Sequence, residues 1–256
     1  MFIGRKWRNG FMRLPNPYAL RREPTRESLV FAASQRPGNC TTQEDFFMNF
    51  NDECFVLADG VGTMPHGDVA ARLACETAIW GYKHIRQHRY YWLDKKLFMK
   101  RIFRSTNLSV WQKRREHGFE AGLETTLTVC MIGSKTYWLG YAGETCVWLQ
   151  SSGSITKLTR DSDPFETEKR TTLGVMRLGL IPDYVTGPLS DDDVLLITSL
   201  GCGNYLTPSD IQSGMGLAGD SVEDATRAVE SVLASAERNG STENMTAVII
   251  KRVATS

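Results

Sequence analysis

The chain has 256 residues, of which 41% are hydrophobic and 23% are charged, and its formal net charge is +1. These values are typical of one ordinary globular domain with a large core, and the balanced charge argues against a general nucleic-acid binder. No apolar run approaches the roughly 18 residues needed to cross a bilayer. The N-terminus also lacks the apolar segment of a secretory signal, so we expect a cytoplasmic protein without a transmembrane segment.

Residues 1–28 form a basic extension ahead of the expected domain, which spans residues 29–254. The extension carries seven Arg and Lys residues against two Glu residues, and three prolines interrupt any helix within it. It is either a tail that contributes little to the core or a docking arm for an acidic partner or a membrane surface. The sequence leaves both interpretations open.

Three strands are expected in the first part of the domain, at residues 28–34, 45–50 and 53–59. The dipeptide Asn51-Asp52 is a suitable turn between the second and the third. A glycine-containing loop then leads to two amphipathic helices. The first starts near Asp68 and is expected to bury a stripe made of Val69, Leu73, Thr77 and Trp80. The second covers about 93–115, with its stripe at Leu93, Leu97, Phe98, Ile102 and Leu108.

The second part of the domain returns to strands. These are expected at residues 125–133, 135–143, 145–150, 155–159, 192–199 and 245–252. A short helix is predicted from the N-cap Thr207 to Ser213, and another at 222–236. The stripe of this last helix comprises Val222, Ala225, Val229, Leu233 and Ala236. Blocks of strands separated by a helix pair predict an α+β fold with antiparallel sheets.

Acidic residues at strand ends point to chemistry. Asp59 follows a buried apolar run and precedes Gly60, whose carbonyl can be approached closely. A carboxylate in that position suits a hard divalent cation, although an Asp-Gly pair after a strand is also an ordinary turn.

The segment around Asp59, FVLADGVGTMPHGDVAARLACE, resembles a signature of the metal-dependent serine/threonine protein phosphatases of type 2C, the PPM family. Six further blocks resemble that family in the same order along the chain, at residues 43–45, 124–127, 142–145, 157–161, 193–201 and 241–246. The resemblance covers about residues 30–252. It implies a β-sandwich of two antiparallel sheets flanked by helix pairs.

The resemblance also implies a site. In the family, two Mn²⁺ or Mg²⁺ ions share one aspartate and hold the water that attacks the phosphorus of phosphoserine or phosphothreonine in a phosphoprotein. Asp59 would be the shared ligand and the Gly60 carbonyl a second one. Asp45 and Glu44 would support the metal pair, and Glu243 would be the last ligand. Glu144 would stand where some bacterial members bind a third ion.

Four positions depart from the family pattern. Leu200 replaces a metal-binding aspartate, and an isobutyl group cannot coordinate a metal. Glu243 and Glu144 each replace aspartate and add one methylene, which matters because Mg²⁺ demands near-ideal geometry. Cys40 stands where the family has its phosphate-binding arginine, and Arg36 is a candidate for that role.

Two functions follow from these departures. In the first, the phosphatase fold has impaired or absent metal-dependent activity and serves a regulatory or binding role toward a phosphoprotein or a protein kinase. In the second, it is an active phosphatase with an atypical metal centre. Leu200 favours the first function, and the retained Asp45, Asp59 and Glu243 favour the second.

Overall fold

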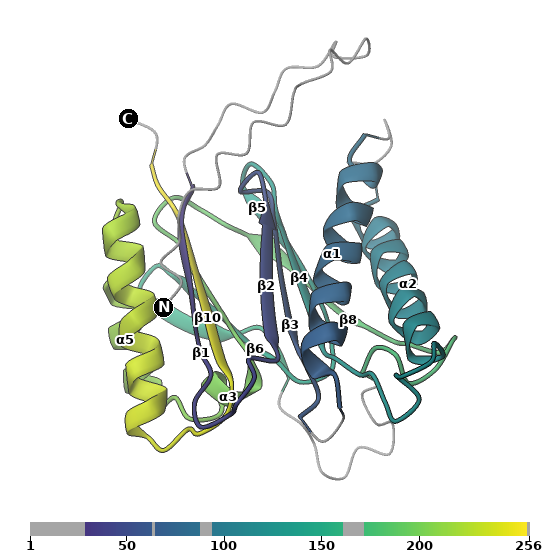
Figure 1. Ribbon diagram of the computed structural model, residues 1–256. Coiled ribbons are helices and arrows are strands. Elements are labelled where there is room, and N and C mark those ends of the chain that lie inside the picture. The colour runs from purple at the N-terminus through teal and green to yellow at the C-terminus, as the bar shows by residue number, and fades with distance from the viewer. Residues whose placement is uncertain (1–28, 63–64, 88–93, 161–171, 255–256) are drawn as a thin grey trace, which may run out of the picture.

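The computed structural model describes residues 29–62, 65–87, 94–160 and 172–254, so the predicted basic extension lies outside the described residues. Within these ranges two five-stranded antiparallel sheets pack face to face, with helices on their outer faces (Figure 1). The predicted α+β sandwich is therefore confirmed.

The strands of the first sheet are β2 (Asp45–Phe50), β3 (Cys54–Asp59), β4 (Leu127–Ile132), β5 (Thr136–Ala142) and β8 (Asp183–Pro188), in that spatial order. The second sheet has the order β1 (Leu29–Arg36), β10 (Met245–Arg252), β9 (Val194–Thr198), β6 (Cys146–Ser151) and β7 (Ser154–Lys157). Strand β8 was not predicted from the sequence. Its residues DYVTGP contain Gly and Pro, which weaken a strand pattern and are tolerated here because β8 is an edge strand.

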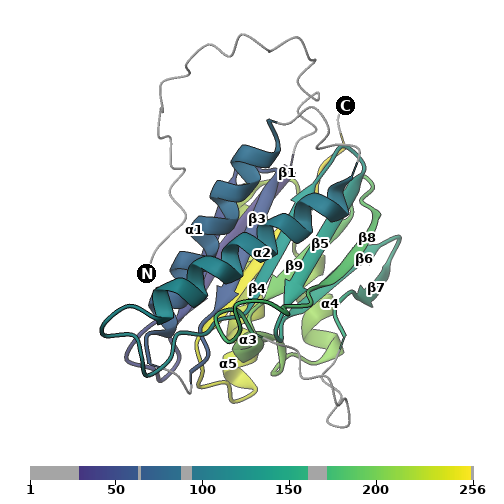
Figure 2. The same ribbon diagram turned by 90° about the vertical axis from the view of Figure 1, so that its right-hand side faces the viewer.

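Helices cover both outer faces, as Figures 1 and 2 show. The first sheet carries α1 (Gly67–Ile85) and α2 (Lys95–Arg114), and the second carries α4 (Pro208–Gly216) and α5 (Val222–Arg238). The short helix α3 (Leu200–Gly203) directly follows β9. No helix within the described ranges is both long enough and apolar enough to span a membrane.

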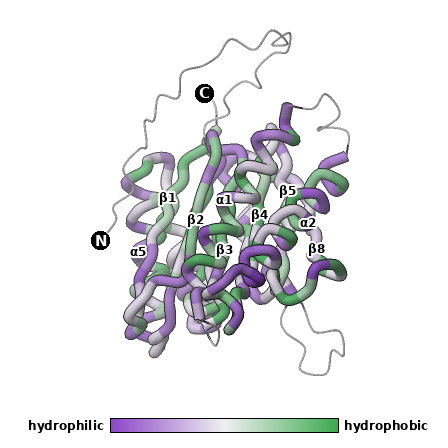
Figure 3. The backbone as a smooth tube through the Cα atoms, turned by 45° about the vertical axis from the view of Figure 1, so that its right-hand side comes forward, coloured by the Kyte–Doolittle hydropathy of each residue, from purple (hydrophilic) through white to green (hydrophobic). Residues whose placement is uncertain are grey.

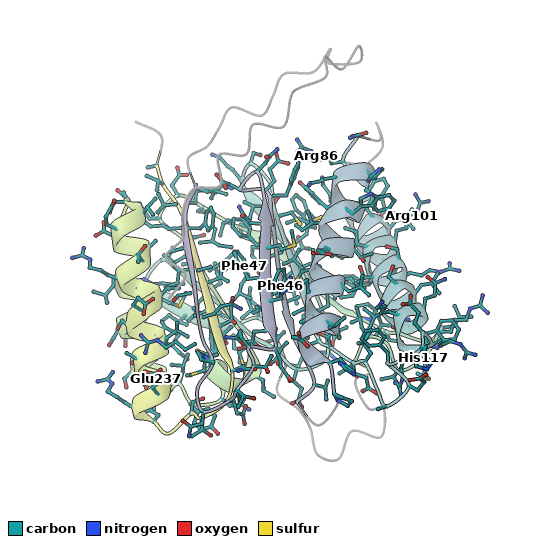
Figure 4. All side chains as sticks on the ribbon, viewed as in Figure 1. Phe46, Phe47, Arg86, Arg101, His117 and Glu237 are labelled. Atoms are coloured by element: carbon teal, nitrogen blue, oxygen red, sulfur yellow. The ribbon has the colours of Figure 1, made fainter. Side chains whose placement is uncertain are left out.

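The core has three layers, one under each helix pair and one between the sheets. Strand β2 contributes to two of them, because successive side chains of a strand point to opposite faces. Phe46 packs under α1, whereas Phe47 packs between the sheets (Figure 4). The strands are accordingly coloured as mostly hydrophobic in Figure 3, while the helices alternate between the two colours.

The expected buried stripe of α1 is only partly right, since Val69 and Leu73 pack against the core but are half-buried. The helix buries mainly small residues, among them Ala70, Ala74 and Ala78, while Trp80 is 59% exposed and stacks on His84 with ring centroids 3.9 Å apart. Alanines let the first turns of the helix approach the sheet closely, and the larger Ile79 and Tyr82 are buried nearer its C-terminal end. In α5 the predicted stripe is confirmed from Ala225 onward, but Val222 is exposed.

Helix α4 begins as predicted, with Thr207 as its N-cap, and a reciprocal capping box with Asp210 satisfies the first turn. Hydrogen bonds from the Thr207 hydroxyl, the Thr207 backbone N–H and the Asn239 amide lower the pKa of Asp210 to about 2. This pKa lies below that of the unfolded chain. The stabilisation is therefore present above about pH 4 and is lost as the pH falls toward 2.

We expect Asp210→Ala to lower the free energy of unfolding by about 1 kcal/mol at pH 7, since it removes the side-chain half of the capping box with Thr207. Urea unfolding at pH 7, 5 and 3 should show the difference from wild type shrinking at the lowest pH. Gln212→Ala, on the exposed side of the same helix, is the control and should change little. A difference that is equal at all three pH values would contradict a role for the Asp210 charge.

Candidate metal centre

Two carboxylates face each other across the β2–β3 hairpin. The turn residues Asn51 and Asp52 have positive φ angles of 51° and 57°, which Asn and Asp tolerate, and the turn was predicted correctly. The register that follows places Asp45 directly opposite Asp59. Directly paired residues lie on the same face of a sheet, so both carboxylates occupy one site.

Asp45 is only 2% exposed and is held from the other sheet. The hydroxyl of Thr246 on β10 donates to its Oδ2 at 2.6 Å. Gln35 on β1 donates from its side-chain amide to the Thr246 oxygen at 3.0 Å and to the Asp45 backbone carbonyl at 3.1 Å. The second carboxylate oxygen, Oδ1, is buried without a hydrogen-bond donor in the described part of the chain. That orphaned oxygen is suited to a cation.

Asp59 ends β3 and is fixed through its backbone. Its N–H donates to the Thr126 hydroxyl at 3.0 Å, and its carbonyl accepts from the Thr126 N–H at 2.9 Å and from the Thr125 hydroxyl at 3.0 Å. The Oδ2 atom of Asp59 accepts a hydrogen bond from the backbone N–H of Leu200 at 3.3 Å. The beginning of α3 therefore meets the site through a backbone donor.

The electrostatics of the pair favour a proton or a cation. Burial raises the pKa of Asp45, and the nearby charge of Glu243 adds to this, while hydrogen bonds from Thr246 and Ser199 lower it in part. Burial and the neighbouring Asp45 raise the pKa of Asp59 well above its usual value. Two carboxylates in one buried site repel when both are ionised, and a bound cation or a shared proton removes that repulsion.

Glu44 and Gly60 lie beside the pair. The Gly60 N–H donates to the Glu44 carbonyl at 3.1 Å, and the Glu44 N–H donates to the Asn244 side chain at 2.8 Å. Burial raises the pKa of Glu44, and Asp68 and Asp45 add to the shift. A side chain at Gly60 would meet the backbone of Gly67 at 2.5 Å, so only glycine allows α1 to start this close to the site.

The remaining two predicted carboxylates are more peripheral. Glu243 is exposed, but its Oε2 is 3.1 Å from where a Cβ on Gly201 would stand, and its charge raises the pKa of both site aspartates. Glu144 is partly buried in the turn between β5 and β6, at the same end of the sheet as Thr126. Within the described ranges, no three His, Cys, Asp or Glu side chains form a group that could hold a metal ion.

The chain was next compared with known proteins. A family model described as protein phosphatase 2C matches residues 38–177, more than half of the chain. The chain belongs to the protein phosphatase 2C family. The sandwich, the strand-end aspartates and the helix pairs are thus features of a phosphatase 2C fold.

Solved structures agree with this family. The catalytic domain of the serine/threonine phosphatase PstP in complex with two manganese ions is 21% identical, with a TM-score of 0.71 over 88% of this chain and 99% of that chain. A Mycobacterium tuberculosis PstP structure is 18% identical, with a TM-score of 0.70 and the same coverage. Stp1 from Staphylococcus aureus is 18% identical, with a TM-score of 0.73 over 88% of this chain and 95% of that chain. A search of curated protein sequences finds no significant match.

Arg36 is not placed at the site of this phosphatase 2C fold. Its guanidinium pairs with Glu230 at 2.7 Å and with Glu237, and both glutamates lie on α5. Figure 4 labels Glu237 on that helix. Side chains alternate along β1, so Gln35 points toward Asp45 and Arg36 points to the opposite face.

Sequence reasoning also missed Gln35 and Thr246. The sequence contains one usable signal, since Thr246 is the second residue of the last strand and the final residue of the block 241–246 that resembles the phosphatase 2C family. The donor set of the described residues fits one cation at the Asp45–Asp59 pair. The described residues bring no third His, Cys, Asp or Glu side chain close enough to complete a group that could hold a metal ion.

Proposed function

We propose that this protein is a phosphatase 2C-fold protein with strongly reduced or absent metal-dependent phosphatase activity. In this proposal it acts by binding a partner, either a phosphoprotein or a protein kinase. The single observation that carries the proposal is Leu200. By the resemblance of residues 193–201 to the family, Leu200 occupies the position of a metal-binding aspartate. Its contact with Asp59 is a hydrogen bond donated by its backbone N–H.

A divalent cation would be held by Asp59, Asp45 and the Gly60 carbonyl, with Glu243 at the margin. Mn²⁺ or Mg²⁺ is the expected ion, because hard oxygen ligands suit both and a related PstP structure carries two manganese ions. Such an ion supplies a water activated for attack and neutralises phosphoryl charge. The chain itself orients Asp45 through Thr246 and Asp59 through Leu200 and Thr126.

Removing one carboxylate from such a centre weakens it in two ways. It takes away a ligand, and it takes away a negative charge that offsets the charge of the ions. A loss of about 3 kcal/mol in metal binding corresponds to a factor of about 100 in occupancy at low metal concentration. The alternative, an active phosphatase with an atypical centre, is supported by the retained Asp45, Asp59 and Glu243 and by the buried Asp45 Oδ1, which has no hydrogen-bond donor among the described residues.

The test is a metal count together with an activity assay. The protein is stripped with EDTA and dialysed against millimolar Mn²⁺, and bound manganese is measured by mass spectrometry. Hydrolysis of p-nitrophenyl phosphate and of a phosphoserine peptide is measured on the same sample. The PstP catalytic domain serves as the active control.

We expect at most one manganese ion per chain and turnover at least about 100-fold below the control. Two bound ions together with turnover comparable to PstP would refute the proposal and support the alternative.

A further inference from the structure

Helix α2 carries a concentrated positive charge. Residues 95–115 contain eight Lys and Arg residues and no Asp or Glu, in a chain whose net charge is only +1. The side chains at the outer face of this helix point away from the body, as Arg101 does in Figure 4. Such a surface attracts an acidic partner.

A groove of about 430 Å³ lies at the C-terminal end of α2, lined by Trp111, Arg114, Arg115, Glu120 and Val175. The guanidinium groups of Arg115 and Arg177 both lie over the Trp111 ring, 5.1 and 5.6 Å from its centroid. Among the described residues, neither Arg115 nor Arg177 has an ion-pair partner. Arg114, in contrast, does have an ion-pair partner, because its Nη1 lies 2.8 Å from Oε1 of Glu124.

The segment that follows Val175 exposes several apolar side chains. Leu178 is 67% exposed and Ile181 77% exposed, and Val175 and Met176 are also exposed. The backbone of this segment is anchored, since the Asn107 amide donates to the Met176 carbonyl at 2.8 Å and accepts from the Gly174 N–H at 3.0 Å. Exposed apolar groups on an anchored segment are typical of a surface that another molecule covers.

The groove adjoins the carboxylate site. The side chain of Glu124 forms the ion pair with Arg114. Its backbone carbonyl accepts a hydrogen bond from the Val61 N–H at 3.1 Å. Thr125, the next residue, exchanges two backbone hydrogen bonds with Leu173, at 3.3 and 2.8 Å. A chain segment bound in the groove would therefore run beside the loop that follows Asp59.

From these contacts we propose that the groove at Trp111, with Arg115 and Arg177, binds an acidic peptide segment of a partner protein that also carries apolar side chains. This inference rests on the proposed binding role, and it names the chemistry of the partner. A guanidinium group can bind a carboxylate through two parallel hydrogen bonds. An Arg side chain already held over an indole ring loses less conformational entropy when it binds a carboxylate. Trp and Arg are enriched among the residues that contribute most to the binding energy of protein interfaces.

The experiment measures fluorescence anisotropy of a fluorescein-labelled peptide of alternating Glu and Leu. A matched peptide with Gln in place of Glu tests the role of charge. The binding variant is Arg115→Gln with Arg177→Gln. The control variant, Arg101→Gln with Arg104→Gln, removes the same charge from exposed α2 positions outside the groove. All samples contain EDTA, and circular dichroism checks that both variants melt like wild type.

We expect wild type to bind the acidic peptide at least about 10-fold more tightly than the Gln peptide. The groove variant should lose about 10-fold in affinity, and the control variant less than about 3-fold. Equal losses in both variants would overturn the groove in favour of diffuse attraction to α2. Preferential binding to vesicles of phosphatidylserine and phosphatidylcholine would overturn a peptide partner. Because no metal is present, the outcome is independent of whether the protein proves to be an active phosphatase.

Discussion

Leu200→Asp should raise the affinity for Mn²⁺ by about 10- to 100-fold. It should also raise the rate of p-nitrophenyl phosphate hydrolysis above that of wild type. The residue starts α3 at the point where its backbone N–H meets the Asp59 carboxylate, so a new carboxylate would stand beside the existing pair. Without metal, the same change should destabilise the fold by about 1–3 kcal/mol, because it adds a like charge to aspartates whose pKa values are already raised. Added Mn²⁺ should recover that stability through binding to the folded state.

Titration calorimetry and initial rates across Mn²⁺ concentrations test this prediction on wild type and variant. Leu200→Asn is the matched control, since it has the size of aspartate without its charge. If Leu200→Asp gains neither affinity nor activity, then the longer Glu243 or the arginine absent from the site is the greater defect. If Leu200→Asn gains as much as Leu200→Asp, the added charge is not the cause.

Asp59→Asn is expected to stabilise the metal-free protein by about 1–3 kcal/mol at pH 7. The asparagine keeps an oxygen for the Leu200 N–H but no longer repels Asp45. The folded-state pKa of Asp59 is raised, so its carboxylate lowers stability as the pH rises through that pKa. The advantage of the variant should therefore be larger at pH 7 than at pH 5.

Urea unfolding in EDTA at both pH values measures this effect. The control is Asp191→Asn, a change at an exposed aspartate, which should alter the free energy of unfolding by less than about 0.5 kcal/mol. Mn²⁺ should stabilise wild type more than Asp59→Asn. A variant that is less stable than wild type at pH 7 in EDTA would show that the two aspartates do not repel in the folded protein.

Local patterns in the sequence were enough to predict the main strands and the hairpin that pairs Asp45 with Asp59, whereas the role of Asp45 in the site came from the family resemblance. The apolar run of β3 and the turn at Asn51-Asp52 determine the hairpin, and the hairpin alone sets the two carboxylates opposite each other. The capped start of α4 was equally local, since Thr207 and Asp210 lie three residues apart. The edge strand β8 has no such pattern.

Contacts between distant parts of the chain were not predictable in this way. Whether Gln35 or Arg36 faces the site depends on which side of β1 meets α5, and a strand of mixed residues does not reveal this. The bond from Thr246 to Asp45 joins residues 201 positions apart. In α1 the stripe was assigned on the assumption that the larger side chains are the buried ones. The structure instead buries several alanines of this helix.

The pairing of β1 with β10 along all eight residues has a consequence for the order of folding. The strands of the first sheet are all made by residue 188, but β1 leaves the ribosome early and must wait for residues 245–252 before it has a neighbour. Contacts this distant in sequence form slowly, because a long loop must close first. The Thr246 hydroxyl reaches Asp45 only at that step. A nascent chain therefore holds its two site aspartates together without the support that orients them, and the site is complete only when the final described strand is in place.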